Sequence, residues 1–327
     1  EPLSDLAQLV LGGGKRIRPA YCHWGWVLSG GGSDGAGALG AGGALELLQA
    51  FALVHDDVMD GSPTRRGAPT GWARFIERHA DRSWRGEDRR FGEAAAILVG
   101  DIAMVMADRA LGDVGPEVRS IWDALRTELN MGQYLDVIGT VSGDVTAAGA
   151  RRIVQHKTAG YTIVHPLQLG AALAGRADLT EPLAAHGLPL GTAFQLRDDV
   201  LGVFGDPERT GKPVGEDLRE GKPTVMLALA REAADAAQGA VLDRVGAATD
   251  AGEIAEIQQA IVDTGALAAI EQEIDTLYDE AVSAIDALPE VAGSRAALRA
   301  LAAFVVARDV CGQGRRARRL NRHTEPV

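Results

Sequence analysis

The sequence is poor in aromatic residues and has no long β-branched runs. Aromatic residues make up only 5% of its 327 positions, whereas alanine and glycine are abundant. This composition favours helices that pack closely through small side chains over a sheet protein. Because 46% of the residues are hydrophobic and 24% are charged, the chain can bury a sizeable core. We therefore expect an all-α fold.

Cysteine and net positive charge are also scarce. The two cysteines, Cys22 and Cys311, lie too far apart for a metal-binding spacing and form no disulfide framework, so reduced thiols in a cytoplasmic protein are expected. The formal charge of −12 argues against a nucleic-acid partner but leaves room for a local basic pocket that takes a small anion. We find no apolar run of the roughly 18–20 residues that a membrane span needs, so no transmembrane segment is expected.

Helical periodicity dominates the chain. Leu45, Leu48 and Ala52 recur at helical spacing ahead of the first pair of aspartates. Further helical candidates, separated by stretches rich in Gly, Pro, Asp and Ser, are residues 93–111, 117–139, 147–175, 181–204, 223–236, 252–287 and 294–310. Nothing resembles an interdomain linker, which predicts a single domain over residues 1–327.

A basic tail covers about residues 312–327, and five arginines lie within 315–322. We interpret it as a solvated end of the chain. The alternative is a flap that adds positive charge around an anionic ligand.

The stretch HDDVMDG places Asp56 and Asp60 four residues apart, with Asp57 beside them. On a helix, residues four apart lie on one face, so two carboxylates project together after the apolar run FALV. Such a pair repels and is costly to desolvate, and an oxygen-bound divalent cation removes that cost. A solvated helix end is the plainer alternative. A calcium loop fails, because Val58 and Gly67 occupy two of its ligand positions.

A second pair of aspartates lies in RDDVLGVFGD. Asp198 and Asp199 again follow an apolar run, but Gly202 fills the place that Asp60 has in the first motif. We expect Gly202 to leave room for a water molecule, and we do not expect Asp206 to replace the lost carboxylate.

Basic residues flanked by glycine accompany both motifs. They are Lys15, Arg16 and Arg18 in GGGKRIRP, Arg65 and Arg66 in TRRG, Lys157 in HKTAGYT, and Lys212 in TGKPVGED. GGGKRIRP is not a Walker A loop, because Arg16 follows Lys15 where Ser or Thr is required. Each basic group alone is weak evidence. Together with the aspartates, they indicate a metal-bridged diphosphate whose remaining oxygens are held by Arg and Lys.

In combination, these motifs resemble those of the trans-isoprenyl diphosphate synthases, or polyprenyl synthetases. The matching stretches, in the family's order from residue 12 to 224, are GGGKRIRP, ELLQAFALVHDDVMDGSPTRRG, LVGD, HKTAGYT and FQLRDDVLGVFGDPERTGKPVGEDLREGKPT. The resemblance implies a single-domain helical bundle around a deep central cavity, and a homodimer. It also implies head-to-tail (1′-4) condensation of an allylic diphosphate with isopentenyl diphosphate. Magnesium would help the allylic diphosphate to leave, in a site that excludes water.

The resemblance assigns roles to the acidic residues. Asp56 and Asp60 would bind two of three magnesium ions, with Asp57 in support. Asp198 would bind the third ion, with Asp199 nearby. Restoring a carboxylate with Gly202→Asp would then change magnesium dependence only modestly. Asp217, together with Lys222, would lie in a loop that closes over the mouth of the cavity.

It also assigns roles to the basic and polar residues, matched position by position. Lys15, Arg18 and Arg66 would hold isopentenyl diphosphate, and Gln49 stands where many members have a histidine for the same ligand. An amide still donates to phosphate, although its pH behaviour differs. Arg65, Lys157 and Lys212 would clamp the allylic diphosphate, and Thr158 and Gln195 would line the reacting centre.

Product length is expected to depend on the residues just before the first motif. Phe51 lies five residues before Asp56, about 7.5 Å along the helix axis at ~1.5 Å per residue, and Ala52 leaves the neighbouring direction open. A single aromatic residue here, without an insertion in the motif, resembles geranylgeranyl (C20) synthases. Farnesyl (C15) and longer products remain alternatives.

Three other classes compete with this interpretation. A terpene cyclase or head-to-head synthase would not need GGGKRIRP and Lys212 for a second diphosphate, and the Asn/Ser/Glu motif of cyclases is missing from the sequence. A non-catalytic partner subunit typically loses motif aspartates or the paired arginines, which are present here. A helical scaffold would have the ordered motifs by chance.

Overall fold

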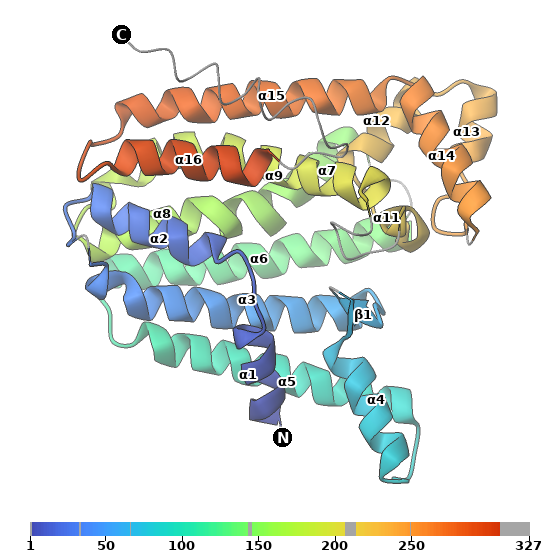
Figure 1. Ribbon diagram of the computed structural model, residues 1–327, viewed down its shortest axis with the longest axis horizontal. Coiled ribbons are helices and arrows are strands. Elements are labelled where there is room, and N and C mark those ends of the chain that lie inside the picture. The colour runs from blue at the N-terminus through green and yellow to red at the C-terminus, as the bar shows by residue number, and fades with distance from the viewer. Residues whose placement is uncertain are drawn as a thin grey trace. The chain divides into compact units, whose positions relative to one another are not determined.

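The computed structural model describes residues 2–32, 34–65, 67–142, 146–206, 214–248 and 250–307. Within these ranges the chain is helical apart from loops and one short hairpin, so the predicted all-α class is confirmed (Figure 1). Its contacts divide it into two compact units: Glu1–Ala124 with His165–Thr180, and Leu125–Val164 with Glu181–Val327. The single domain over residues 1–327 stays a prediction.

Unit 1 holds the first aspartate motif. Its elements are α1 (Pro2–Leu11), α2 (Ile17–Leu28), η1 (Ala36–Ala38), α3 (Leu39–Met59), β1 (Thr64–Arg65), β2 (Ala68–Pro69), α4 (Gly71–Asp81), α5 (Asp88–Leu111), the first residues of α6 (Pro116–Ser142), α8 (His165–Leu173) and η3 (Ala177–Leu179). The long helix α3 packs along α5, and α2 packs along α8 (Figure 1).

Unit 2 holds the second aspartate motif. Its elements are the rest of α6, α7 (Ala147–Val154), the π-helix η2 (Gln155–Val164), α9 (Thr180–Phe204), α11 (Glu216–Glu220), α12 (Val225–Ala233), α13 (Ala236–Leu242), α14 (Ala251–Asp263), α15 (Ala266–Ala284), η4 (Ile285–Ala287) and α16 (Ser294–Val306). Its second motif ends α9, as the sequence predicts. Helix α12 begins where the Thr224 hydroxyl accepts a hydrogen bond from the Leu227 amide.

Small residues permit the close helix packing that the composition predicts. In unit 1, a Cβ on Gly25 of α2 would overlap the Leu167 carbonyl of α8, and a Cβ on Gly170 of α8 would overlap the Cys22 carbonyl of α2. Each helix therefore presents a glycine to the backbone of the other. In unit 2, Gly132 and Gly191 likewise face the backbone of the π-helix at Lys157 and Ala159.

Several predicted element boundaries are wrong. The expected helix 147–175 contains the π-helix η2. The expected helix 252–287 is broken at Gly265, which has a φ of 81° and precedes the first residue of α15. Helix α4 was not predicted, although Trp72, Phe75 and His79 are buried at helical spacing. The short hairpin in which Arg65 pairs with Ala68 was not predicted either.

The stretch Ala36–Met59 is long and apolar enough, by length and composition alone, to cross a membrane. The expectation that no run reaches this length is therefore wrong for this stretch. Within unit 1, however, it packs against α5 and α2, and its Leu45 and Leu48 are fully buried. A core helix passes the same composition test, and 44% of an 18-residue apolar window in this stretch is buried inside the structure.

Adding a methyl group at Gly191 should destabilise the protein, because the new Cβ would lie 2.5 Å from the Ala159 Cα. We expect Gly191→Ala to lower the free energy of unfolding by about 1–3 kcal/mol, measured by urea denaturation. Gly239→Ala in α13 is the matched control, since nothing lies within 4 Å of its Cβ position. The control should be neutral or stabilising by up to ~1 kcal/mol. Equal losses in the two variants would contradict this account.

Candidate functional site

The first aspartate motif lies at the carboxyl end of α3. Asp56 and Asp57 belong to the last turn, and Asp60 follows as the residue that ends the helix. Asp57 is only 5% exposed, whereas Asp56 and Asp60 are half-buried. The apolar helix predicted from the sequence thus ends in carboxylates that are partly or fully buried.

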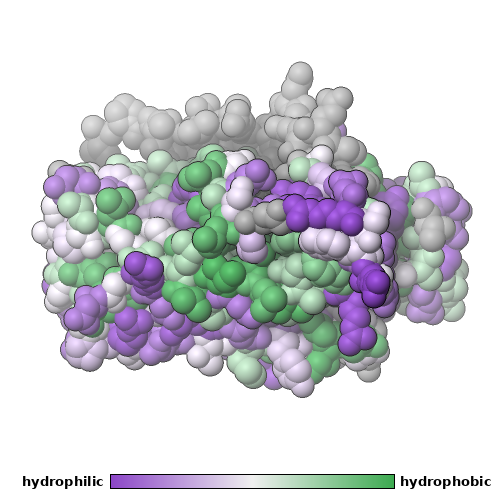
Figure 2. Space-filling view, turned by 90° about the horizontal axis from the view of Figure 1, so that it is seen from below, coloured by the Kyte–Doolittle hydropathy of each residue, from purple (hydrophilic) through white to green (hydrophobic). Residues whose placement is uncertain are grey.

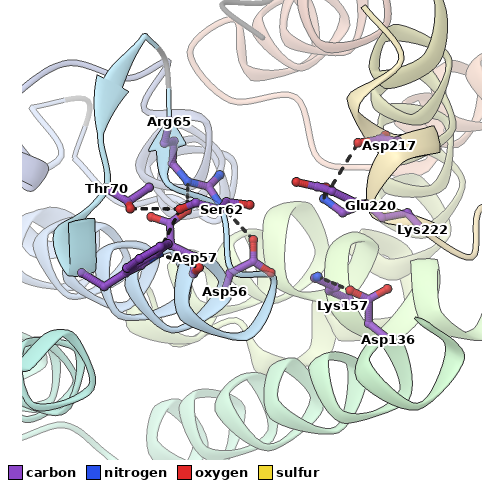
Figure 3. Close-up of polar contacts among 11 residues, drawn as sticks. Asp56, Asp57, Ser62, Arg65, Thr70, Asp136, Lys157, Asp217, Glu220 and Lys222 are labelled. Carbon is purple, nitrogen blue, oxygen red and sulfur yellow. Dashed lines mark hydrogen bonds and ion pairs between the residues drawn. The ribbon is translucent and has the colours of Figure 1, made fainter. Parts of the chain in front are cut away.

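Arg65 of the hairpin neutralises two of these carboxylates. Its Nε donates to Asp57 Oδ1 at 2.6 Å, and its Nη2 donates to Asp56 Oδ2 at 3.0 Å (Figure 3). Burial raises the pKa of Asp57 to about 6, although Arg65 opposes the rise. Burial would lower the pKa of Arg65, but the two carboxylates raise it. Arg65, which the sequence predicts to clamp a diphosphate, is thus an ion-pair partner of the first aspartate motif in this structure.

Two side chains of the next segment fix the loop that brings Arg65 back to α3. Trp72 Nε1 donates to the Asp57 and Ser62 carbonyls, both at 3.0 Å. The Thr70 hydroxyl donates to the Ser62 carbonyl at 2.9 Å (Figure 3). This support was not predicted from the sequence, although the buried Trp72 lies in the first turn of an amphipathic helix.

The predicted phosphate-binding turn GGGKRIRP joins α1 to α2. Gly13, Gly14 and Arg16 all have positive φ, so the backbone takes a sharp course that favours glycine at the first two positions. Arg16 forms an ion pair with Glu46 of α3 and donates to the Val10 carbonyl at 2.5 Å. It therefore holds the turn to α3, a role that the sequence analysis did not assign.

The remaining predicted residues of unit 1 lie on or near α3. Lys15 is exposed, and Arg18 and Gln49 are half-buried. Phe51 is buried, and its ring lies 4.6 Å from that of His55, whose Nε2 lies 3.0 Å from the Ile97 carbonyl of α5. Ala52 is half-buried and stands one turn before Asp56.

In unit 2, the π-helix carries the HKTAGYT motif. Lys157 donates to Asp136 of α6 at 2.6 Å (Figure 3). The Thr158 hydroxyl donates to Gln195 Oε1 of α9 at 2.6 Å. π-Helical turns occur frequently at functional sites, and this one places neighbouring residues against two different helices. Asp136 is a further residue that the sequence analysis did not single out.

Asp199 completes this hydrogen-bonded chain. The Gln195 amide donates to its Oδ1 at 2.7 Å, one turn away on α9. Burial raises the pKa of Asp199 to about 8, opposed by the Gln195 hydrogen bond and raised further by Asp217 and Asp198. Its role as a metal ligand stays a prediction, because its carboxyl group is buried beside Gln195.

The space beside Gly202 is not filled in the expected way. A Cβ built on Gly202 would overlap the carboxylate of Asp217, which belongs to α11. The expectation that a water molecule takes this place is therefore wrong. Lys222 lies 3.9 Å from Asp217 and 2.9 Å from Glu220 (Figure 3). Asp206 is exposed.

Some predicted residues lie outside the described part of the chain. They are Arg66, Lys212, Cys311 and the basic tail at 312–327. Among the described residues, no group of three His, Cys, Asp or Glu side chains is arranged to hold a metal ion.

Comparison with known proteins places the chain in a family. The polyprenyl synthetase model matches residues 1–264. A geranylfarnesyl diphosphate synthase of Aeropyrum pernix is 31% identical over 311 residues, 92% of either chain. A nonaprenyl diphosphate synthase of Mycobacterium tuberculosis is 34% identical over 319 residues, 94% of this chain and 87% of that protein.

The fold agrees with solved structures. The crystal structure of a geranylgeranyl pyrophosphate synthase from Corynebacterium glutamicum, complexed with isoprenyl diphosphate and magnesium, has a TM-score of 0.90 and 39% identity. The match covers 94% of this chain and 90% of that one. With both sequence and fold matched over most of its length, the chain belongs to the polyprenyl synthetase family and is a prenyltransferase of the isoprenyl diphosphate synthase type.

Proposed function

We propose that the protein condenses isopentenyl diphosphate with an allylic diphosphate, head to tail (1′-4), to make all-trans geranylgeranyl diphosphate (C20). The observation that carries the proposal is that each unit places aspartates in the last turns of an apolar helix, with charged partners beside them. In unit 1, Arg65 pairs with Asp56 and Asp57. In unit 2, Asp217, which lies 3.9 Å from Lys222, stands against Gly202 of the second motif. The likeness to the Corynebacterium glutamicum enzyme, which is complexed with isoprenyl diphosphate and magnesium, supports it.

The carboxylates fit a hard divalent cation, and we propose three magnesium ions when diphosphate is bound. Asp56, Asp57 and Asp60 would serve from the first motif, and Asp198 and Asp199 from the second. When bound, magnesium would neutralise the diphosphate and make it a better leaving group. Until then, Arg65 limits the repulsion between Asp56 and Asp57.

The basic and polar residues would hold the two substrates. For isopentenyl diphosphate we propose Lys15, Arg18, Gln49 and Arg66, and for the allylic diphosphate Arg65, Lys157, Lys212 and Lys222. Thr158 and Gln195 are held in place by a hydrogen bond of 2.6 Å to one another. Their oxygens would line the reacting centre and stabilise developing positive charge. A cytoplasmic location is also proposed.

The function is tested by incubating the protein with magnesium, isopentenyl diphosphate and each of the C5, C10 and C15 allylic diphosphates in turn. Chromatography of the dephosphorylated products should reveal a C20 prenyl alcohol that is lost when EDTA removes the metal. A C15 or longer main product would correct only the chain length. No condensation with any allylic substrate would support a non-catalytic partner subunit instead.

Product length can be tested at Phe51. We expect Phe51→Ala to shift the products beyond C20, because it removes a buried ring five residues before Asp56. Ala52→Phe is the matched opposite change and should shorten the product, since residue 52 lies one turn before Asp56 on the same face. Both are measured by product chromatography at equal substrate conversion. An unchanged distribution in Phe51→Ala would remove Phe51 as the floor.

We also propose a homodimer that associates through α5. Its outer side exposes Ile97, Leu98, Val105 and Met106, and Leu98 and Val105 are 63% and 69% exposed. A groove of about 550 Å³ between α4 and α5 extends this surface, and Phe75, Trp84 and Phe91 contribute to its lining. Figure 2 shows hydrophobic residues gathered across the side on which α5 lies in Figure 1. Exposed apolar patches of this kind mark association surfaces.

The dimer proposal predicts a sedimentation mass of two chains for the wild type. Leu98→Asp should shift the equilibrium toward one chain, because it places a charge in the apolar contact. Leu39→Asp is the matched control: Leu39 is 78% exposed but lies on α3, so this change should leave the mass unaltered. A wild-type mass of one chain would contradict the proposal.

A further inference from the structure

The second aspartate motif lacks one carboxylate that the first possesses. In α3, Asp56 and Asp60 stand four residues apart, whereas in α9 Gly202 stands four residues after Asp198. A glycine inside a helix costs about 1 kcal/mol relative to alanine. Its presence in α9 therefore requires a reason in the packing around it.

The structure provides that reason. The carboxylate of Asp217 lies where a side chain on residue 202 would begin, because a Cβ built on Gly202 would overlap its Oδ2. Asp217 belongs to the first turn of α11, fifteen residues further along the chain (217 minus 202). Because residue 202 is a glycine, the carboxylate of Asp217 from α11 can occupy the space that a side chain at position 202 would fill.

The surroundings give Asp217 the charge environment of a motif carboxylate. Lys222 Nζ lies 3.9 Å from Asp217 Oδ1, and the Lys222 amide donates to the Asp217 carbonyl at 3.0 Å. Asp198 stands one helical turn before Gly202 on α9, so it lies on the same face of that helix as the Asp217 carboxylate that contacts Gly202. Asp199 itself accepts a hydrogen bond from Gln195, which lies one turn before it on α9, whereas Gly202 follows it.

We propose that Asp217 replaces the carboxylate missing at Gly202, so that Asp198 and Asp217 together serve the magnesium ion on the second motif's side of the diphosphate. This inference rests on the proposed function. Gly202 and Asp217 then act as a matched pair: the glycine removes one acid from the helix and makes room for another from α11. The competing role for Asp217 is purely structural, as the ion-pair partner that positions Lys222.

A position swap separates the two roles. The 327-residue chain is titrated with magnesium at a fixed concentration of inorganic pyrophosphate. Its thermal stabilisation is followed by melting, and binding is followed by calorimetry. Asp217→Asn keeps the shape and removes the charge, and it should raise the magnesium concentration for half-maximal stabilisation about 10-fold or more. The double variant Gly202→Asp, Asp217→Ala returns a carboxylate through the helix and should bring the value back to within about threefold of wild type.

Two single variants complete the design. Gly202→Asp alone should lower the melting temperature without metal, because the new side chain overlaps Asp217. Asp206→Asn is the matched control, since Asp206 is an exposed acid just after the same motif and should leave magnesium dependence unchanged. Circular dichroism without metal reports whether each variant is folded.

The inference is overturned if Asp217→Asn binds magnesium and pyrophosphate like the wild type, or if a folded swap variant stays as weak as Asp217→Asn. The second result would show that Asp217 has the structural role of positioning Lys222. Asp217→Asn is nearly isosteric, so it decides the matter even if the swap variant unfolds. A wild type that shows no magnesium-dependent pyrophosphate binding would instead overturn the proposed function, and this inference with it.

Discussion

The constraint on which this structure depends is the cost of holding carboxylates near one another at the ends of apolar helices. Asp57 and Asp199 are both buried, and burial raises the pKa of each well above the ordinary value. Each unit meets this cost differently. Unit 1 brings a guanidinium against Asp57, whereas unit 2 gives Asp199 an amide hydrogen bond from Gln195. The cost of burial is therefore offset by a cation in unit 1 and by a neutral amide in unit 2.

Holding these groups in place requires close approach of backbones, which explains the composition. The π-helix places Lys157 toward α6 and Thr158 toward α9, and glycines at 132 and 191 let it lie against the backbones of both helices. In unit 1, Gly100 of α5 leaves space for the His55 ring next to the first motif. An abundance of small residues is thus a requirement of the site as well as of the fold.

The features that could be predicted from the sequence are those that depend on a local residue pattern. Apolar periodicity placed α3 and α9 correctly up to their aspartates, and the spacing of Asp56 and Asp60 put both at the end of one helix. It did not predict the π-helix, because a π-turn leaves the apolar pattern nearly helical. The Arg16–Glu46 and Lys157–Asp136 pairs were also missed, since each joins residues more than twenty positions apart and a single sequence carries no signal for such contacts.

Gly202 illustrates why that limit matters for function. Judged by register alone, the second motif is one acid short, and the simplest expectation is an empty space for water. In three dimensions the position is occupied by Asp217, whose sequence neighbourhood gives no hint of α9. A motif defined by spacing along one helix therefore undercounts its carboxylates when a glycine admits one from elsewhere. By this reasoning the two aspartate motifs resemble each other in charge more closely than in sequence, and Gly202 is where the site is completed from outside the helix.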